Sequence, residues 1–167
     1  MIKLTDLLNE IKTDYTIYCD MDGVLVDFDQ GYKDLTGMST KEADSQGKEA
    51  FWSPIAKAGA AFWIRLKWMS DGQQLWEYIS QYNPILLSAP SKEESSKIGK
   101  RVWVKQNIPG TKLILRPASQ KQQFSGENKI LIDDRVDNIE QWRNKGGIGI
   151  LHTSASDTIK QLKELGL

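Results

Sequence analysis

The chain has 167 residues, enough for one domain with its own core, or for one domain that carries a small insertion. Lysine plus arginine (22) equals aspartate plus glutamate (22), so no net charge favours nucleic acid or an anionic membrane as a partner. With one cysteine and one histidine, the sequence excludes an internal disulfide, a cysteine-built zinc site and a histidine-rich metal site, so a bound metal would have oxygen ligands.

The first half of the chain predicts one buried strand followed by a helical insertion. Residues 2–11 have apolar side chains at nearly helical spacing, which indicates a helix. Residues 15–20, YTIYCD, are a short β-prone run that ends at Asp20. Residues 37–82 contain no convincing strand, are rich in aromatic side chains and predict two or three helical pieces. Because this segment lies between the first strand and the second, we expect it to form a cap over the carboxyl edge of a sheet.

The second half of the chain alternates strands with helices. Apolar runs predict four further strands at residues 84–90, 111–117, 129–134 and 148–152. Ser91 and Glu94 have the spacing of a capping box, so we expect a helix from there to about Gln106. Two more helical patterns lie at residues 138–147 and 157–167.

Strands that are apolar throughout and alternate with helices are typical of a parallel sheet covered on both faces. The predicted fold class is therefore α/β, with a Rossmann-like parallel sheet and a small helical cap inserted after the first strand. We expect residues 1–29 and 83–167 to form the core and residues 30–82 to form the cap.

Polar side chains gather where the predicted strands end. Asp20 ends the first strand, Ser88 the second and Asp133 the fourth, and Lys121 lies in the loop before the fourth. In open α/β sheets, ligands bind outside the carboxyl ends of the strands. We therefore expect these four side chains to meet at one site.

The segment 20–29, DMDGVLVDFD, carries four carboxylates and could instead be a calcium loop or a solvated turn. An EF-hand loop beginning at Asp20 would need an oxygen ligand at its fifth position, glycine at the sixth and glutamate at the twelfth. The chain has Val24, Leu25 and Gly31 at those positions. The sequence GVLV is too apolar for a solvated turn, so a carboxylate cluster at a strand end is the interpretation that remains.

Four motifs, in this order, resemble those of the haloacid dehalogenase (HAD) superfamily phosphatases. Residues 20–28 are similar to the first motif, Ser88 to the second, Lys121 to the third, and ILIDD, with Asp133 and Asp134, to the fourth. Within the superfamily, the segments DMDGVLVDF, SAPSK, WVKQNIPG and KILIDDR most resemble the 5′(3′)-deoxyribonucleotidases. The resemblance covers roughly residues 15–145.

The resemblance implies a hydrolysis in two steps. Asp20 would attack phosphorus and form an aspartyl-phosphate. Asp22 would protonate the leaving oxygen and then activate water. The family's Mg²⁺ would be held by Asp20, by the backbone carbonyl of Asp22, and by Asp133 or Asp134, between which the sequence does not decide.

The resemblance also implies which residues hold the substrate. The Lys121 ammonium and the Ser88 hydroxyl, at a position where the nucleotidases usually have threonine, would bind phosphoryl oxygens. Gly23 would let the backbone approach the phosphate closely. Lys92 matches a phosphate-side lysine of the nucleotidases.

Three aromatic residues, Phe28, Phe51 and Trp52, match positions that line the base pocket of the nucleotidases. A nucleobase stacks well on flat apolar surfaces. Phe51 and Trp52, with the other aromatics of the insertion, could instead form the core of a small helical cap.

Other features have plain structural interpretations. Lys97, Arg101 and Lys105 recur every four residues, which indicates the solvated face of a helix. Asp133 and Asp134 taken alone could cap the following helix.

Taken together, the sequence predicts a Mg²⁺-dependent phosphatase, most similar to a 5′-nucleotidase acting on (deoxy)ribonucleoside monophosphates. The alternatives are a phosphatase acting on nucleic-acid ends and a family member that binds a phosphorylated ligand without turnover. We expect a small-molecule phosphomonoester as partner, with no membrane and no nucleic acid, and the sequence leaves a homodimer open. No signal peptide and no transmembrane run is predicted, so a cytoplasmic location is expected.

Overall fold

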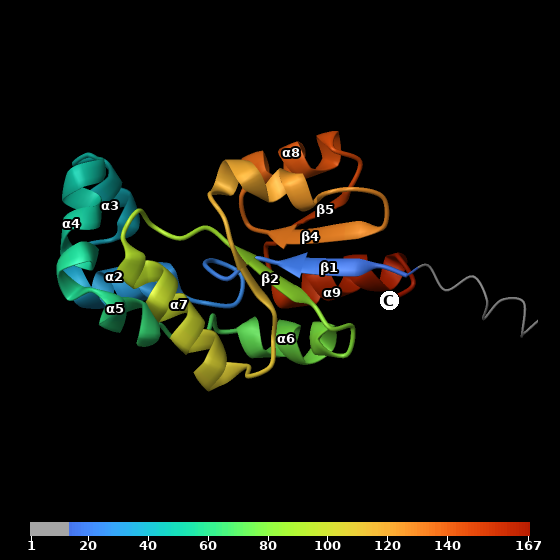
Figure 1. Cartoon of the computed structure of the whole chain (residues 1–167), viewed down its shortest axis with the longest axis horizontal. Coiled ribbons are helices and arrows are strands. Elements are labelled where there is room, and N and C mark those ends of the chain that lie inside the picture. The colour runs from blue at the N-terminus through green and yellow to red at the C-terminus, as the bar shows by residue number, and fades with distance from the viewer. Residues whose placement is uncertain (1–13) are drawn as a thin grey trace, which may run out of the picture.

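Five parallel strands form the centre of the molecule. The computed structural model describes residues 14–167, so the predicted helix at residues 2–11 lies outside the described residues. The strands are β1 (Thr16–Cys19), β2 (Ile85–Ser88), β3 (Leu113–Leu115), β4 (Lys129–Asp133) and β5 (Ile148–Leu151). Their order across the sheet is β3-β2-β1-β4-β5 and every pair is parallel, which confirms the predicted α/β sheet (Figure 1).

Alternating residues of the central strands face opposite sides of the sheet, and both sides are buried. Tyr18, Leu87 and Leu131 belong to one hydrophobic cluster, while their neighbours Ile17 and Cys19 belong to a second and larger one. Strands buried on both faces must be apolar at every position. This explains why the runs of β1, β2 and β4 were recognisable in the sequence.

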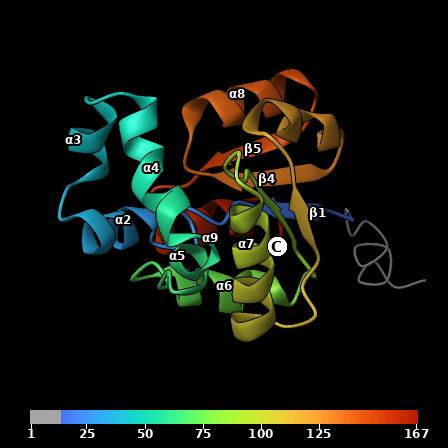
Figure 2. The same ribbon diagram turned by 60° about the vertical axis from the view of Figure 1, so that its left-hand side comes forward.

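Helices cover the two faces of the sheet. They are α6 (Gly72–Ser80), α7 (Glu94–Asn107), the 3-10 helix η1 (Ala118–Phe124), α8 (Val136–Asn144) and α9 (Ala155–Glu164). In Figures 1 and 2, α8 lies on one side of the sheet and α6 lies on the other. The large buried apolar side chains of α6, α7 and α9 join the larger cluster, and those of α8 join the smaller one.

Four further helices follow β1 and lie beyond its carboxyl end (Figure 1). They are α2 (Phe28–Thr36), α3 (Thr40–Asp44), α4 (Lys48–Ala58) and α5 (Ala60–Ile64). The chain returns alongside its own exit point, because Met69 N–H donates to Leu25 O at 2.8 Å and Asp27 N–H donates to Lys67 O at 2.8 Å. Helix α5 packs on α7, where Gly99 leaves room for Trp63.

One helix begins differently from the sequence prediction. Helix α7 begins at Glu94 with Glu93 as its N-cap, so the capping box expected at Ser91 does not form. Ser39 and Glu42 form a capping box instead, at the start of α3. Within residues 14–167, no helix is long and apolar enough to cross a membrane.

Candidate active site

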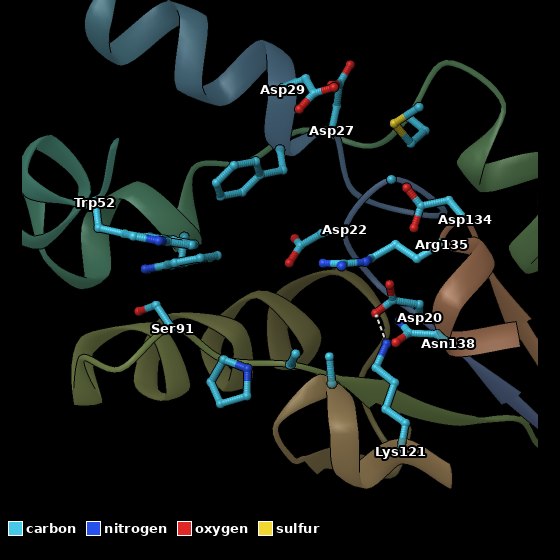
Figure 3. Close-up of a pocket in the computed structure, with 17 residues that line it drawn as sticks. Asp20, Asp22, Asp27, Asp29, Trp52, Ser91, Lys121, Asp134, Arg135 and Asn138 are labelled. Atoms are coloured by element: carbon cyan, nitrogen blue, oxygen red, sulfur yellow. Dashed lines mark ion pairs between the residues drawn. The ribbon is translucent and has the colours of Figure 1, made fainter. Parts of the chain in front are cut away.

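A pocket of about 500 Å³ lies at the carboxyl ends of β1 and β4, facing helices α2, α4 and α5. Of the residues predicted from the sequence, it is lined by Asp20, Asp22, Gly23, Phe28, Trp52, Lys121 and Asp134. Figure 3 shows Asp20, Asp134 and Asn138 at one side of the pocket, Trp52 at the other and Asp22 between them. As expected, predicted side chains from different strand ends meet in one pocket.

A tight loop after β1 positions the first two carboxylates. Asp20 still belongs to the sheet through its N–H, which donates to Ile132 O at 2.9 Å. The next carbonyl, that of Met21, accepts hydrogen bonds from the N–H groups of residues 24–26, so the chain turns back at once. Gly23 has a φ of +79°, and a Cβ there would lie 2.2 Å from Asp134 Oδ2. Only glycine allows this turn with the fourth motif so close.

Lys121 joins two of the predicted carboxylates. Its Nζ lies 2.8 Å from Asp133 Oδ2 and 3.0 Å from Asp20 Oδ1, and the side chain is buried. Burial alone would lower the pKa of Lys121, but the negative charges of Asp20 and Asp133 and the hydrogen bonds to them raise it. Lys121 is therefore a permanent cation at the pocket floor.

Asp133 is fully buried, and its two oxygens are already engaged. They accept hydrogen bonds from Lys121, from Arg135 N–H at 2.9 Å and from the Asn138 amide at 3.0 and 3.2 Å. Burial, followed by the charge of Asp20, raises the pKa of Asp133, and Lys121 opposes this shift. Asp133 thus holds Lys121 and the loop in place.

Asp134, next in the chain, presents its carboxylate to the pocket. No side chain within residues 14–167 donates a hydrogen bond to it. Loss of hydration where the carboxylate packs against the loop, followed by the charges of Asp20 and Asp133, raises the pKa of Asp134 to about 7. Three carboxylates around a single lysine leave an excess of negative charge at this point.

That excess charge fits a divalent cation. Oxygen atoms of Asp20, Asp133 and Asp134 lie within 4.8 Å of one another and could hold a metal ion. An all-carboxylate donor set suits Mg²⁺, which prefers oxygen ligands and keeps several waters. The Asp22 carboxylate is not part of this set and pairs with a lysine instead.

This lysine, Lys100, was not predicted as a site residue. Its Nζ lies 2.5 Å from Asp22 Oδ2 and 3.1 Å from Ser88 Oγ, and the side chain is 2% exposed. The sequence did contain a signal, because Lys100 shares the buried face of α7 with Gly99 and Trp103. A lysine on the apolar face of a helix needs a buried partner.

Four predicted residues do not reach the pocket wall, and the first is the fully buried Asp133. Ser88 is fully buried and binds Lys100, so it lies beneath the pocket. Lys92 is exposed, in the loop before α7, and Phe51 stacks on Tyr32 with ring centroids 4.7 Å apart.

Aromatic rings form the opposite wall of the pocket. Phe28 and Trp52 both line it, with ring centroids 6.2 Å apart, and Trp52 is 39% exposed. Trp63, from α5, also lines the pocket although it is 2% exposed. The sequence analysis did not separate Trp63 from the other aromatic residues of the insertion, which could form the core of a cap.

Comparisons with known proteins agree with this arrangement at the level of the fold. No protein-family model and no curated protein sequence matches the chain. Among solved structures, a HAD-superfamily hydrolase from Ehrlichia chaffeensis matches 91% of this chain and 97% of its own, with a TM-score of 0.53 and 9% identity. The chain has the fold of a HAD-superfamily hydrolase. A hydrolase from Streptococcus pneumoniae TIGR4 matches 90% of this chain and 99% of its own, with a TM-score of 0.55 and 14% identity.

In this chain the four motif positions lie together at the carboxyl edge of the sheet. At 9–14% identity the likeness concerns the fold, so the chemistry has to be argued from this chain's own residues.

Proposed function

We propose that the protein is a Mg²⁺-dependent phosphatase of the HAD superfamily that hydrolyses phosphomonoesters through an aspartyl-phosphate on Asp20. One observation carries the proposal. Asp20 is fixed by Lys121 at the floor of a pocket, beside Asp22, which has an oxygen without a partner within residues 14–167.

Asp20 is oriented as a nucleophile would be. Its Oδ1 accepts from Met21 N–H at 2.8 Å and lies 3.0 Å from Lys121 Nζ. No donor in the described part of the chain reaches Oδ2, so that oxygen would attack phosphorus. A bond forms between Oδ2 and phosphorus while the bond from phosphorus to the substrate's alcohol oxygen breaks.

Asp22 would move the proton in both steps. Its Oδ2 is held by Lys100, while its Oδ1 is buried and has no hydrogen-bond partner in residues 14–167. Oδ1 would give a proton to the departing alcohol oxygen. It would then take one from the water that cleaves the aspartyl-phosphate and releases inorganic phosphate.

The two lysines have separate tasks. An ammonium has three donors, and Lys121 uses two of them on Asp20 and Asp133, which leaves one for a phosphoryl oxygen. Lys100 holds Asp22, and Ser88 would hold Lys100.

Asp20 and Asp134 would hold the Mg²⁺ ion, because the oxygens of Asp133 are already occupied by hydrogen bonds. When bound, the ion neutralises the carboxylates and the phosphate and makes the phosphorus more electrophilic.

A nucleoside monophosphate is the substrate that the pocket supports best. Phe28 and Trp52 line the pocket and offer flat apolar surfaces for a base, and Figure 3 shows Trp52 on the side opposite Asp20. The volume of about 500 Å³ is in the range of small-molecule sites. The sequence resemblance to the deoxyribonucleotidases favours deoxyribonucleotides within this class.

Release of inorganic phosphate from a panel of nucleoside monophosphates, with phenyl phosphate beside it, tests the proposal. We expect Mg²⁺-dependent turnover that is abolished in Asp20→Asn. Asp137→Asn is the matched control, because Asp137 is exposed and pairs with Arg135 at 3.0 Å. Turnover in EDTA, or an Asp20→Asn variant retaining a tenth of the rate, would refute the mechanism.

A further inference from the structure

Trp63 lines the pocket and has a buried hydrogen-bond donor without a partner in residues 14–167. Its side chain is 2% exposed, and its indole Nε1 makes no hydrogen bond to any of residues 14–167. Buried donors in folded proteins are almost always paired, so an exception calls for an explanation. One explanation is an acceptor that arrives with a ligand.

The other two deeply buried tryptophans show what is usual in this fold. Trp103 Nε1 donates to Leu66 O at 2.8 Å, and Trp142 Nε1 donates to Lys129 O at 3.0 Å. Neither of these residues lines the pocket. The unpaired donor therefore belongs to the one buried indole that borders the pocket.

The indole of Trp63 is held firmly in place. A Cβ on Gly99 would lie 2.4 Å from Trp63 Cβ, which shows how tightly α7 packs against it. Lys100 Nζ lies 4.8 Å from the ring centroid, and Phe28 and Phe62 pack on the ring at centroid distances of 5.7 and 5.1 Å. The ring cannot turn to another partner without disturbing these contacts.

Lys100 connects this donor to the candidate acid. The same ammonium that lies over the Trp63 ring binds Asp22, whose Oδ1 is the second buried polar atom left unpaired in residues 14–167. One pocket thus contains an unpaired indole N–H and an unpaired carboxyl oxygen on side chains that share one lysine. When Oδ1 carries the proton that the first step requires, both groups donate, so a substrate that satisfied both would supply the ester oxygen and a second acceptor oxygen.

We propose that Trp63 Nε1–H donates a hydrogen bond to an acceptor oxygen on the nucleoside part of the substrate, while Asp22 acts on the ester oxygen. The proposal rests on the proposed phosphatase function and makes Trp63 a specificity-determining residue. It selects phosphomonoesters whose alcohol carries a second oxygen over those of simple alcohols.

Trp63→Phe keeps an aromatic ring in the same place and removes the donor. We compare kcat/KM for thymidine 5′-monophosphate with that for phenyl phosphate, whose leaving group has no second oxygen. The expected result is a loss of about two- to tenfold on the nucleotide, the usual worth of one hydrogen bond, and little change on phenyl phosphate. Equal losses on both substrates, or no loss on either, would overturn the proposal.

Trp103→Phe is the matched control, because it removes a paired indole donor away from the pocket. It should lower Tm, since Leu66 O is left unpaired, and leave the ratio of the two kcat/KM values unchanged. Both variants lose the same ring volume in the core, so Trp63→Phe should lower Tm less than Trp103→Phe, because it leaves no buried carbonyl unpaired.

A binding measurement separates this proposal from the phosphatase function. The indole N–H resonance of Trp63, assigned by its absence in Trp63→Phe, should move when thymidine is added and stay in place with inorganic phosphate. Absence of a shift with thymidine would refute the donor role even if the enzyme hydrolyses phosphomonoesters. Absence of turnover, together with a shift, would refute the phosphatase function alone.

Discussion

The ammonium of Lys100 lies 2.5 Å from Oδ2 of Asp22, although 78 residues separate the two in the chain. Lys100 comes from α7 and Asp22 from the loop after β1, so the contact joins two separate parts of the sheet edge. The same ammonium contacts Ser88 at the end of β2. One buried lysine therefore aligns residues from the first two motifs.

Lys100→Met should impair both activity and stability. It removes the cation and leaves Asp22 and Ser88 without their partner, and breaking a buried ion pair costs about 3–5 kcal/mol. We expect kcat to fall by about 10²-fold or more, because the candidate acid loses its orientation, together with a clear drop in Tm. Steady-state kinetics and thermal unfolding measure the two effects.

The control for this variant lies one turn earlier on the same helix. Lys97 pairs with Glu94 at 2.9 Å and its side chain is 39% exposed, so Lys97→Met removes an identical charge from the more solvated face of the helix. It should change stability by less than about 0.5 kcal/mol and leave kcat unaltered. Similar behaviour of the two variants would mean that Lys100 has no special role.

Mg²⁺ should stabilise the wild-type protein through Asp134. Ligand at a hundredfold excess over Kd adds about 2.7 kcal/mol, or roughly 5–10 °C in Tm for a chain of this size. Asp134→Asn should lose most of this increase, whereas Asp137→Asn, at an exposed ion pair, should keep it. An undiminished Mg²⁺ shift in Asp134→Asn would mean that Asp133 is the ligand instead.

The metal-free protein should also lose stability as pH rises. The pKa of Asp134 is raised from 3.8 to about 7 in the fold, so the unfolded chain releases the proton first. The contribution of protonated Asp134 to the free energy of unfolding is fully present below about pH 4 and is lost as pH rises toward about 7. In EDTA, Asp134→Asn should therefore have a smaller decline in Tm across this window than the wild type. If Tm fell equally in Asp134→Asn and in the wild type, groups other than Asp134 would cause the pH dependence.

The fold was predictable because its central strands, β1, β2 and β4, are buried on both faces, whereas the site was predictable only in part. Asp20, Asp133 and Lys121 end strands or lie beside them, so their positions follow from the topology of a parallel sheet. Lys100 was not predicted because the spacing of Lys97, Arg101 and Lys105 indicates only the solvated face of α7. The partners of a lysine on the opposite, buried face lie far away in the sequence. Whether a side chain lies on the pocket wall, as Trp52 does, or packs behind it, as Phe51 does, depends on contacts between helices that the sequence does not reveal.

Gly99→Ala should destabilise the protein even though alanine favours helix formation. The added Cβ would lie 2.4 Å from Trp63 Cβ and 2.9 Å from Ala60 O, so α5 and α7 would have to separate. Overpacking costs about 1–3 kcal/mol, against a helix-propensity gain of about 1 kcal/mol. Ser95→Ala, on the same helix and only partly buried, should be nearly neutral. A higher Tm for Gly99→Ala would show that the two helices are loosely packed.

Trp52→Ala should separate binding of the base from the chemistry at phosphorus. Trp52 lines the pocket and is 39% exposed, so its loss removes a stacking surface and little core. We expect kcat/KM for a nucleoside monophosphate to fall by about 1–3 kcal/mol, roughly ten- to a hundredfold, if base stacking has its usual strength. Turnover of phenyl phosphate, which needs no base pocket, should change far less, and Tm should stay close to that of the wild type.

Phe51→Ala is the informative comparison, because Phe51 precedes Trp52 in α4 and packs inward. Its ring stacks on Tyr32 at 4.7 Å between centroids, and its carbonyl accepts from the Tyr32 hydroxyl at 3.1 Å. Removing the ring should cost up to about 3–5 kcal/mol of stability, as for other large aromatic truncations in a core, and should affect both substrates alike. If Trp52→Ala also lowered Tm and reduced both activities equally, Trp52 would be part of the cap core. The assignment of a nucleobase to this pocket would then have to be abandoned.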